Sequence, residues 1–196
     1  IFYDNAVSSA CNKVFSAAII RKNHLRFSEQ MILYEDLDFV LRTLPSCGRI
    51  AFLDRTYYHY RIREEQDHFS QRIRDLGFLH NNLKELAESA ISLQSETVEQ
   101  VTANLCAQVY DRYLLLIPRS KKEVDEARKS IKSSCALERL KREGVLPNEK
   151  SCASWMLVTN ERSSELWASL VKRRTVRQMK RTAKSVLRKI GLEKKQ

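Results

Sequence analysis

The chain has 196 residues, of which 43% are hydrophobic, and a formal net charge of +11. That hydrophobic fraction is enough to build a buried core and excludes an intrinsically disordered chain. No run of 18 or more apolar residues occurs, so we expect no transmembrane helix within these residues.

Turn-forming residues and cysteines are both informative. Only four glycines and three prolines occur, which favours long helices over a sheet sandwich. The five cysteines include no C-x-x-C pair and are odd in number, so we expect reduced thiols in a cytosolic protein and no zinc site: Cys11, Cys47, Cys106, Cys135 and Cys152. The chain opens IFYDNAVSSACNKVF without an initiator Met, and we expect it to be a fragment whose upstream part is missing.

The first 70 residues mix helical and extended patterns. Apolar spacing predicts a helix over 13–22 with Asn12 as a plausible N-cap, and another over 33–44 that Pro45 and Gly48 end. The segments RIAFLD (49–54) and TYYHYRIR (56–63) are rich in β-branched and aromatic residues, and we expect both to be strands.

The following hundred residues have only helical patterns. Apolar spacing predicts helices over 76–91 and 98–116, the second ended by Pro118. The sequence SKKE at 120–123 has the spacing of a capping box and opens a third predicted helix, which continues through Leu140 to Gly144. We therefore place a domain boundary near residue 74, with a helical appendage over 74–171.

The positive charge is concentrated at the C-terminus. Residues 172–196 contain eleven Lys or Arg against one acid, Glu193, a net charge of +10 that leaves about +1 for the rest of the chain. Apolar residues recur there at steps of three and four: Val176, Met179, Ala183, Val186, Leu187 and Ile190. This cationic amphipathic helix could lie on an anionic membrane surface or pack on the body with a basic exterior. Nucleic-acid binding is disfavoured, because aromatic interleaving and known RNA-binding motifs are missing.

Five short segments together resemble a known family. In chain order they are CNKVF (11–15), LRF (25–27), YEDLDF (34–39), RIAFLD (49–54) and YHYRIR (58–63), with Ser70 shortly after. They resemble the second half of the catalytic domain of family-2 glycosyltransferases of the GT-A fold, which build bacterial capsule, lipopolysaccharide and teichoic-acid polymers. The resemblance covers about residues 8–72. It implies an α/β fold, with residues 1–73 as the C-terminal half of a Rossmann-like nucleotide-sugar domain, followed by the mostly α-helical appendage and the basic helix 172–196.

The resemblance also implies a catalytic acid. Inverting sugar transfer needs a carboxylate that takes the proton of the acceptor hydroxyl, and the matching residue is Asp36. Glu35 would shape the acceptor pocket or tune its neighbour, since adjacent carboxylates separate each other's pKa values. Asn12 and Lys13 would line the acceptor side. The simpler interpretation of the two acids is that a helix dipole stabilises acids in its first turn.

The sequence Asp36-Leu37-Asp38 is formally a D-x-D, but we do not interpret it as a metal site. On a helix, positions i and i+2 point about 200° apart and cannot chelate one ion. Asp38 is therefore expected to be a solvated helix residue. In the family the metal-binding D-x-D lies upstream, so Mn²⁺ or Mg²⁺ is expected for the intact enzyme, with ligands that this chain lacks.

The last strand and its loop are the expected donor side. Arg61 and Arg63 would share one face of an extended segment and could both contact a diphosphate, and by resemblance Ser70 could do the same. Tyr58 and His59 complete the predicted substrate-binding set, although a lone His is more often packed or exposed than a metal ligand.

Two functions from different classes follow. The first is an inverting glycosyltransferase that moves a sugar from a nucleotide-diphosphate donor to a glycan or lipid-linked acceptor in cell-surface polysaccharide synthesis, with this fragment inactive alone. It would be cytoplasmic or peripheral at the inner face of the cell membrane. The alternative is a non-catalytic helical binding module whose basic tail attaches to anionic membrane or nucleic acid.

Overall fold

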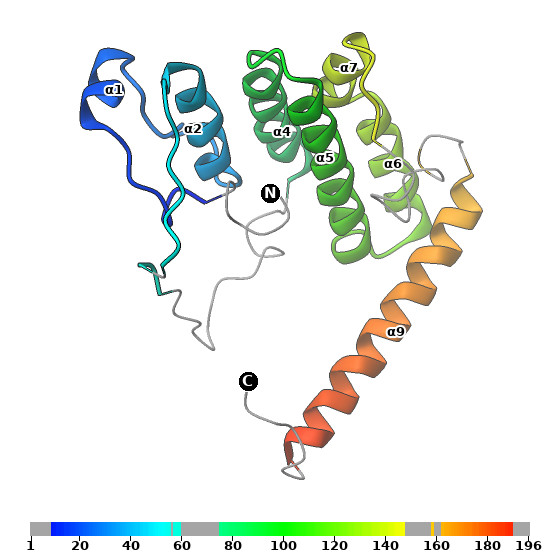
Figure 1. Cartoon of the computed structure of the whole chain (residues 1–196). Coiled ribbons are helices and arrows are strands. Elements are labelled where there is room, and N and C mark those ends of the chain that lie inside the picture. The colour runs from blue at the N-terminus through cyan, green and yellow to red at the C-terminus, as the bar shows by residue number, and fades with distance from the viewer. Residues whose placement is uncertain (1–8, 56, 60–74, 148–157, 159–161, 190–196) are drawn as a thin grey trace.

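The computed structural model describes residues 9–55, 57–59, 75–147, 158 and 162–189 (Figure 1). Every regular element in these ranges is a helix. In chain order the elements are α1 (Ala17–Lys22), α2 (Glu35–Thr43), the short 3-10 helix η2 (Leu44–Ser46), α4 (Leu76–Ile91), α5 (Glu96–Leu116), α6 (Lys121–Lys132), α7 (Cys135–Arg142) and α9 (Ser163–Lys189). Among these helices, none is long and apolar enough to cross a membrane.

The predicted α/β fold is wrong for the part of the chain that the structure describes. Residues 49–55 and 57–59 form neither helix nor strand, and the described ranges contain no sheet. A strand is stable only when its backbone pairs with a neighbouring strand, and β-propensity alone does not provide that partner. Residues 56 and 60–63 of the second predicted strand lie outside the described residues.

The two N-terminal helices are confirmed, with changed boundaries. Helix α1 begins four residues later than predicted, with Ser16 rather than Asn12 at its N-cap, and it buries none of its residues. Helix α2 covers the acid-rich segment, and Pro45 lies in the 3-10 turn that follows it. Both helices are too short to be stable in isolation, so their packing decides whether they form.

Helices α4 to α7 enclose the main hydrophobic core (Figure 1). Asp75 caps α4 by accepting a hydrogen bond from the Gly77 N–H at 2.8 Å. The core consists of fully buried side chains that include Leu79, Leu83, Tyr110, Leu114, Val124, Ile131 and Leu140, and Leu166 and Leu170 of α9 join it. Helix α9 therefore begins before the predicted residue 172, and its first turns belong to the body.

The predicted third helix is two helices. The capping box is confirmed at its start, because the Glu123 N–H donates to Ser120 Oγ at 3.2 Å and the Arg119 N–H donates to Glu123 Oε2 at 2.6 Å. The helix then stops at Lys132, where the Ser133 hydroxyl can donate to the carbonyls of Lys129 and Ser130. Serine side chains compete in this way with helical hydrogen bonds, and the break lets α7 fold back onto α4.

The N-terminal region is attached to the bundle through α4. Met31, Leu37 and Leu41 are buried against Leu86 and Ala90, in a second small core. The predicted domain boundary near residue 74 falls at the end of 60–74, which lies outside the described residues, and it stays a prediction.

Candidate functional site

The predicted acid pair occupies the first two positions of α2. Both side chains are half-buried, and Asp36 Oδ2 accepts hydrogen bonds from Ser9 Oγ and from the Ala10 N–H, each at 3.2 Å. The donors precede Asp36 by more than twenty residues, so this carboxylate ties the start of the described chain to the start of α2.

Lys13 completes this group of polar residues. Its ammonium donates to the Ser9 carbonyl and, at 2.8 Å, to Asn12 Oδ1. Burial lowers the pKa of Lys13, and the negative charge of Asp36 partly opposes that shift. The structure therefore brings three predicted residues together, and we refer to Ser9, Asn12, Lys13 and Asp36 as the Asp36 cluster.

Tyr34, directly before the acids, has an unusual backbone. Its φ of 61° and ψ of 18° lie in the left-handed region, which a non-glycine residue adopts at a cost of roughly 1 kcal/mol or more. Its side chain packs against both hydrophobic cores, and burial raises its pKa to about 12. Packing of this ring thus holds a strained turn at the point where the chain presents Glu35 and Asp36.

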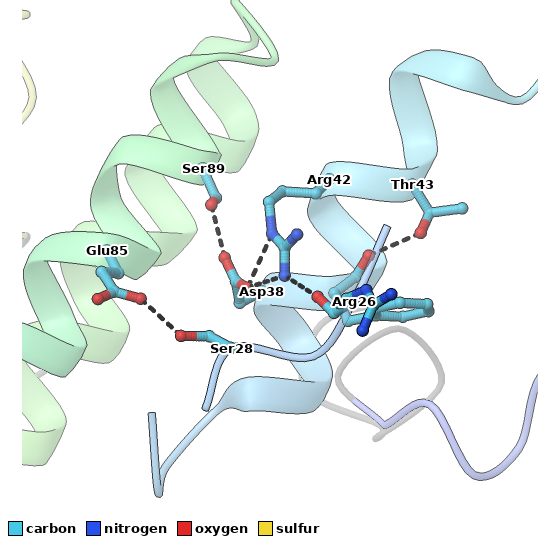
Figure 2. Close-up of polar contacts among 8 residues, drawn as sticks. Arg26, Ser28, Asp38, Arg42, Thr43, Glu85 and Ser89 are labelled. Carbon is cyan, nitrogen blue, oxygen red and sulfur yellow. Dashed lines mark hydrogen bonds and ion pairs between the residues drawn. The ribbon is translucent and has the colours of Figure 1, made fainter. Parts of the chain in front are cut away.

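Asp38 is not the solvated residue that we predicted. It is 3% exposed, and its Oδ2 accepts from Arg42 Nε at 2.9 Å and Nη2 at 2.6 Å, while Oδ1 accepts from Ser89 Oγ at 2.6 Å (Figure 2). Arg42 Nη2 also donates to the Arg26 carbonyl at 2.7 Å. Asp38 and Arg42 are four residues apart on a helix, a spacing visible in the sequence that would have suggested the pair.

A polar face of α4 orients the segment before α2. Asn82 Oδ1 accepts from the N–H groups of Ile32 at 2.9 Å and Leu33 at 3.3 Å, and Ser28 Oγ donates to Glu85 Oε2 at 3.0 Å. Figure 2 shows Glu85 and Ser89 directed at this segment and at Asp38. Asn82, Glu85 and Ser89 share one helical face, so polar residues within an otherwise apolar pattern were the signal for this contact.

Aromatic rings anchor the N-terminal segment on the other side of α2. The buried Phe39 ring stacks on Phe27 with centroids 4.3 Å apart and meets Phe15 edge-on at 5.2 Å. Helix α2 is thus fixed by α4 on one side and by residues 15 and 27 on the other. These contacts position the backbone that carries Asp36.

The other predicted site residues are not assembled into this cluster. Tyr58 and His59 are exposed on the segment without regular structure. Arg61, Arg63 and Ser70, the predicted diphosphate contacts, lie outside the described residues. The structure therefore describes the predicted acceptor side and, of the predicted donor side, Tyr58 and His59.

A second polar cluster, which sequence reasoning missed, joins three helices of the bundle. His80 Nδ1 lies 2.7 Å from Tyr110 Oη, and Nε2 lies 2.9 Å from Ser130 Oγ. A neutral imidazole has one donor and one acceptor, which matches two hydroxyl partners. Burial lowers the pKa of His80 and so favours this neutral form. No motif marks these residues, because their spacing in the sequence reflects only the packing of α4, α5 and α6.

The described residues also bear on metal binding. Within the ranges that the structure describes, His, Cys, Asp and Glu side chains form no group of three that could hold a metal ion. Comparison of the chain with protein families, curated proteins and solved structures gives no match.

Proposed function

We propose that Asp36 is the general base of a sugar-transfer site, and that the protein is an inverting glycosyltransferase using a nucleotide-diphosphate sugar and a glycan or lipid-linked acceptor. The observation that supports this proposal is the placement of Asp36. Its carboxylate is half-buried at the N-terminus of α2 and accepts hydrogen bonds from Ser9 and Ala10, and the backbone of Tyr34, two residues earlier, is strained. Strained backbone of this kind is concentrated at functional sites.

In the proposed reaction, Asp36 accepts the proton of the acceptor hydroxyl while the hydroxyl oxygen attacks the anomeric carbon. The bond from that carbon to the nucleotide diphosphate breaks on the opposite face, and the configuration inverts. Ser9 and Ala10 both bond Oδ2, so we assign Oδ1 as the oxygen that receives the proton. A nearby carboxylate also stabilises a transition state that resembles an oxocarbenium ion.

The neighbouring residues have supporting parts. Lys13 donates hydrogen bonds to the Ser9 carbonyl and to Asn12 Oδ1. These bonds keep Ser9 and Ala10 in place beside Asp36. Glu35 is half-buried beside the base and would contact the acceptor rather than take its proton. Arg61, Arg63 and Ser70 would contact the leaving diphosphate, and this part of the proposal rests on the sequence alone.

The test compares Asp36→Asn with Glu35→Gln in the full-length protein. Transfer and hydrolysis of a panel of UDP- and GDP-sugars are measured with Mn²⁺ or Mg²⁺, together with donor binding by calorimetry. Loss of a general base lowers the rate by roughly 10²- to 10⁴-fold, so Asp36→Asn should lose activity on that scale while still binding donor. Glu35→Gln should mainly raise the acceptor KM.

Two outcomes of this test would contradict the proposal. Wild-type transfer by Asp36→Asn would mean that the acid pair only stabilises the start of α2, as a helix dipole does for acids. If the full-length protein neither binds nor turns over any donor, the glycosyltransferase proposal fails as a whole and the non-catalytic binding module replaces it.

A further inference from the structure

The two sides of α9 differ in their contacts with the described part of the bundle. Leu166 and Leu170 are fully buried against the bundle. One turn later the same side continues with arginines: Arg173 forms a bidentate pair with Asp111, with N–O distances of 2.8 and 2.5 Å, and Arg174 donates to the carbonyls of Leu114, Leu115 and Pro118. The bundle-facing side of α9 thus changes from apolar to cationic.

The apolar residues that follow face away from the bundle. Val176 is 44% exposed, Met179 is 65% exposed and Ala183 is also exposed. At 100° per residue these three lie within about 60° of one another, and roughly 130° from the direction of Leu166 and Leu170. This stripe therefore does not pack on the bundle, whereas the first turns of α9 do. The two predicted uses of the basic tail both stay predictions.

Cations flank this exposed stripe. Lys172 lies one turn before Val176 on the same side of the helix, Lys180 lies beside Met179, and both side chains are exposed. Figure 1 shows α9 starting next to α6 and then running away from the other helices. A flat surface could therefore approach the stripe without meeting the bundle.

We propose that the solvent-facing stripe of α9, formed by Val176, Met179 and Ala183 with Lys172 and Lys180, docks on an anionic lipid surface. Apolar side chains of such a helix enter the boundary between headgroups and acyl chains, while lysines remain among the anionic headgroups. The net charge of +10 over residues 172–196 is complementary to that surface. A nucleic acid would use the cations but not the apolar stripe, and a second copy of this helix would be repelled by the same charge.

The first test measures flotation of the whole 196-residue chain with vesicles. Phosphatidylcholine vesicles are compared with vesicles that also contain phosphatidylglycerol. We expect binding to the anionic vesicles that is at least tenfold tighter than to the neutral ones and that weakens as salt is raised, because each lysine near the surface contributes roughly fivefold. Equal binding to both vesicles, or binding to neither, would overturn the proposal.

Variants separate the stripe from charge alone. The pair Val176→Ser and Met179→Ser should reduce anionic-vesicle binding at least tenfold, and so should the pair Lys172→Gln and Lys180→Gln. The matched control pair, Gln178→Ser and Thr182→Ser, changes exposed residues on another side of the helix and should bind like the wild type. All these positions are exposed, so circular dichroism should show an unchanged helical content. Wild-type binding by the stripe variant would contradict the proposal.

Two competing partners are measured with the same proteins. If fluorescence anisotropy shows tighter binding to single-stranded RNA or duplex DNA than to vesicles, unaffected by the stripe variant, the surface serves nucleic acid and the lipid proposal is wrong. If sedimentation velocity shows a dimer that the stripe variant abolishes, the stripe is a self-association face and the proposal is again wrong. None of these measurements uses a sugar donor, so the result is independent of the role of Asp36.

Discussion

The described N-terminal region, residues 9–55 and 57–59, and the described helical bundle, residues 75–147 and 162–189, bury their apolar residues to very different extents. In the bundle, Leu79 and Leu83 are fully buried, whereas Phe52 remains 81% exposed and Leu53 67% exposed. Helix α1 buries no residue, and α2 is covered mainly because α4 lies beside it. The bundle thus stabilises itself, while the region that carries the proposed catalytic acid depends on the bundle.

The dependence of the N-terminal region on the bundle follows from the short length of its helices and from their contacts. Helices of six and nine residues cannot persist in water without tertiary contacts, since helix nucleation is unfavourable. The contacts that join α2 and the segment before it to α4 are a small apolar core, the Asp38–Ser89 hydrogen bond and the Asn82 hydrogen bonds. We therefore expect the N-terminal region to open locally at a lower free energy than the bundle.

The largest expected effect is loss of bundle stability in Leu83→Ala. This side chain is fully buried in the main core, so its truncation leaves a cavity and should lower the free energy of unfolding by about 3 kcal/mol. Urea denaturation followed by circular dichroism measures the change. The control, Leu146→Ala, removes a side chain that is 55% exposed and should change stability by no more than about 0.5 kcal/mol. Equal effects of the two substitutions would show that Leu83 is not a core residue.

The next effect is on the N-terminal region alone. Asp38→Ala leaves the Arg42 guanidinium and the Ser89 hydroxyl without their shared acceptor, and should cost about 2 kcal/mol because Arg42 is partly solvated. Hydrogen exchange should become faster in α2 but not in α5. The exposed acid Glu88, changed to Ala, is the control. Similar acceleration in α2 and α5 would mean that the two regions unfold as one unit, contrary to the comparison above.

A smaller change is expected at the start of α6. Ser120→Ala removes the hydroxyl that accepts from the Glu123 N–H, and should lower the free energy of unfolding by about 1 kcal/mol. Thermal unfolding can measure this loss. Lys122→Ala, at a side chain that is 87% exposed, should have almost no effect on Tm and controls for local helix propensity. An unchanged Tm in Ser120→Ala would mean that the capping box does not contribute to the stability of the fold.

The smallest effect is the pH dependence due to His80. Burial lowers its pKa below the ordinary value of 6.5, so the unfolded chain binds the proton more readily than the folded one. Neutral His80 contributes its full stabilisation above pH 6.5. This contribution is lost as the pH falls through the pKa of His80 in the folded chain, which is lower than 6.5. Stability curves of wild type and His80→Asn should therefore converge as the pH falls below 6.5. Parallel curves over that range would contradict the assignment.

Much of the local structure could be predicted from the sequence. Apolar spacing located α2, α4 and α5, and the SKKE motif located the start of α6, because helix formation and capping depend on residues three or four positions apart. Glu35 and Asp36 were also predicted as site residues, from the resemblance of five segments to a known family, and their role stays a prediction. The left-handed turn at Tyr34 was not predicted, since no local signal accompanied it.

Which side of each helix is covered depends on the packing of the whole fold. Asp36 and Asp38 are acids two residues apart, yet one is half-buried at the Asp36 cluster and the other is fully buried against Ser89. The stripe of α9 has the spacing of a buried face but points to solvent, because Leu166 and Leu170 set the rotation of the helix against the bundle. The segment 49–54 has the composition of a strand, but no neighbouring strand pairs with it in the described chain. The sequence determines local periodicity, whereas burial and strand pairing depend on neighbours distant in the chain.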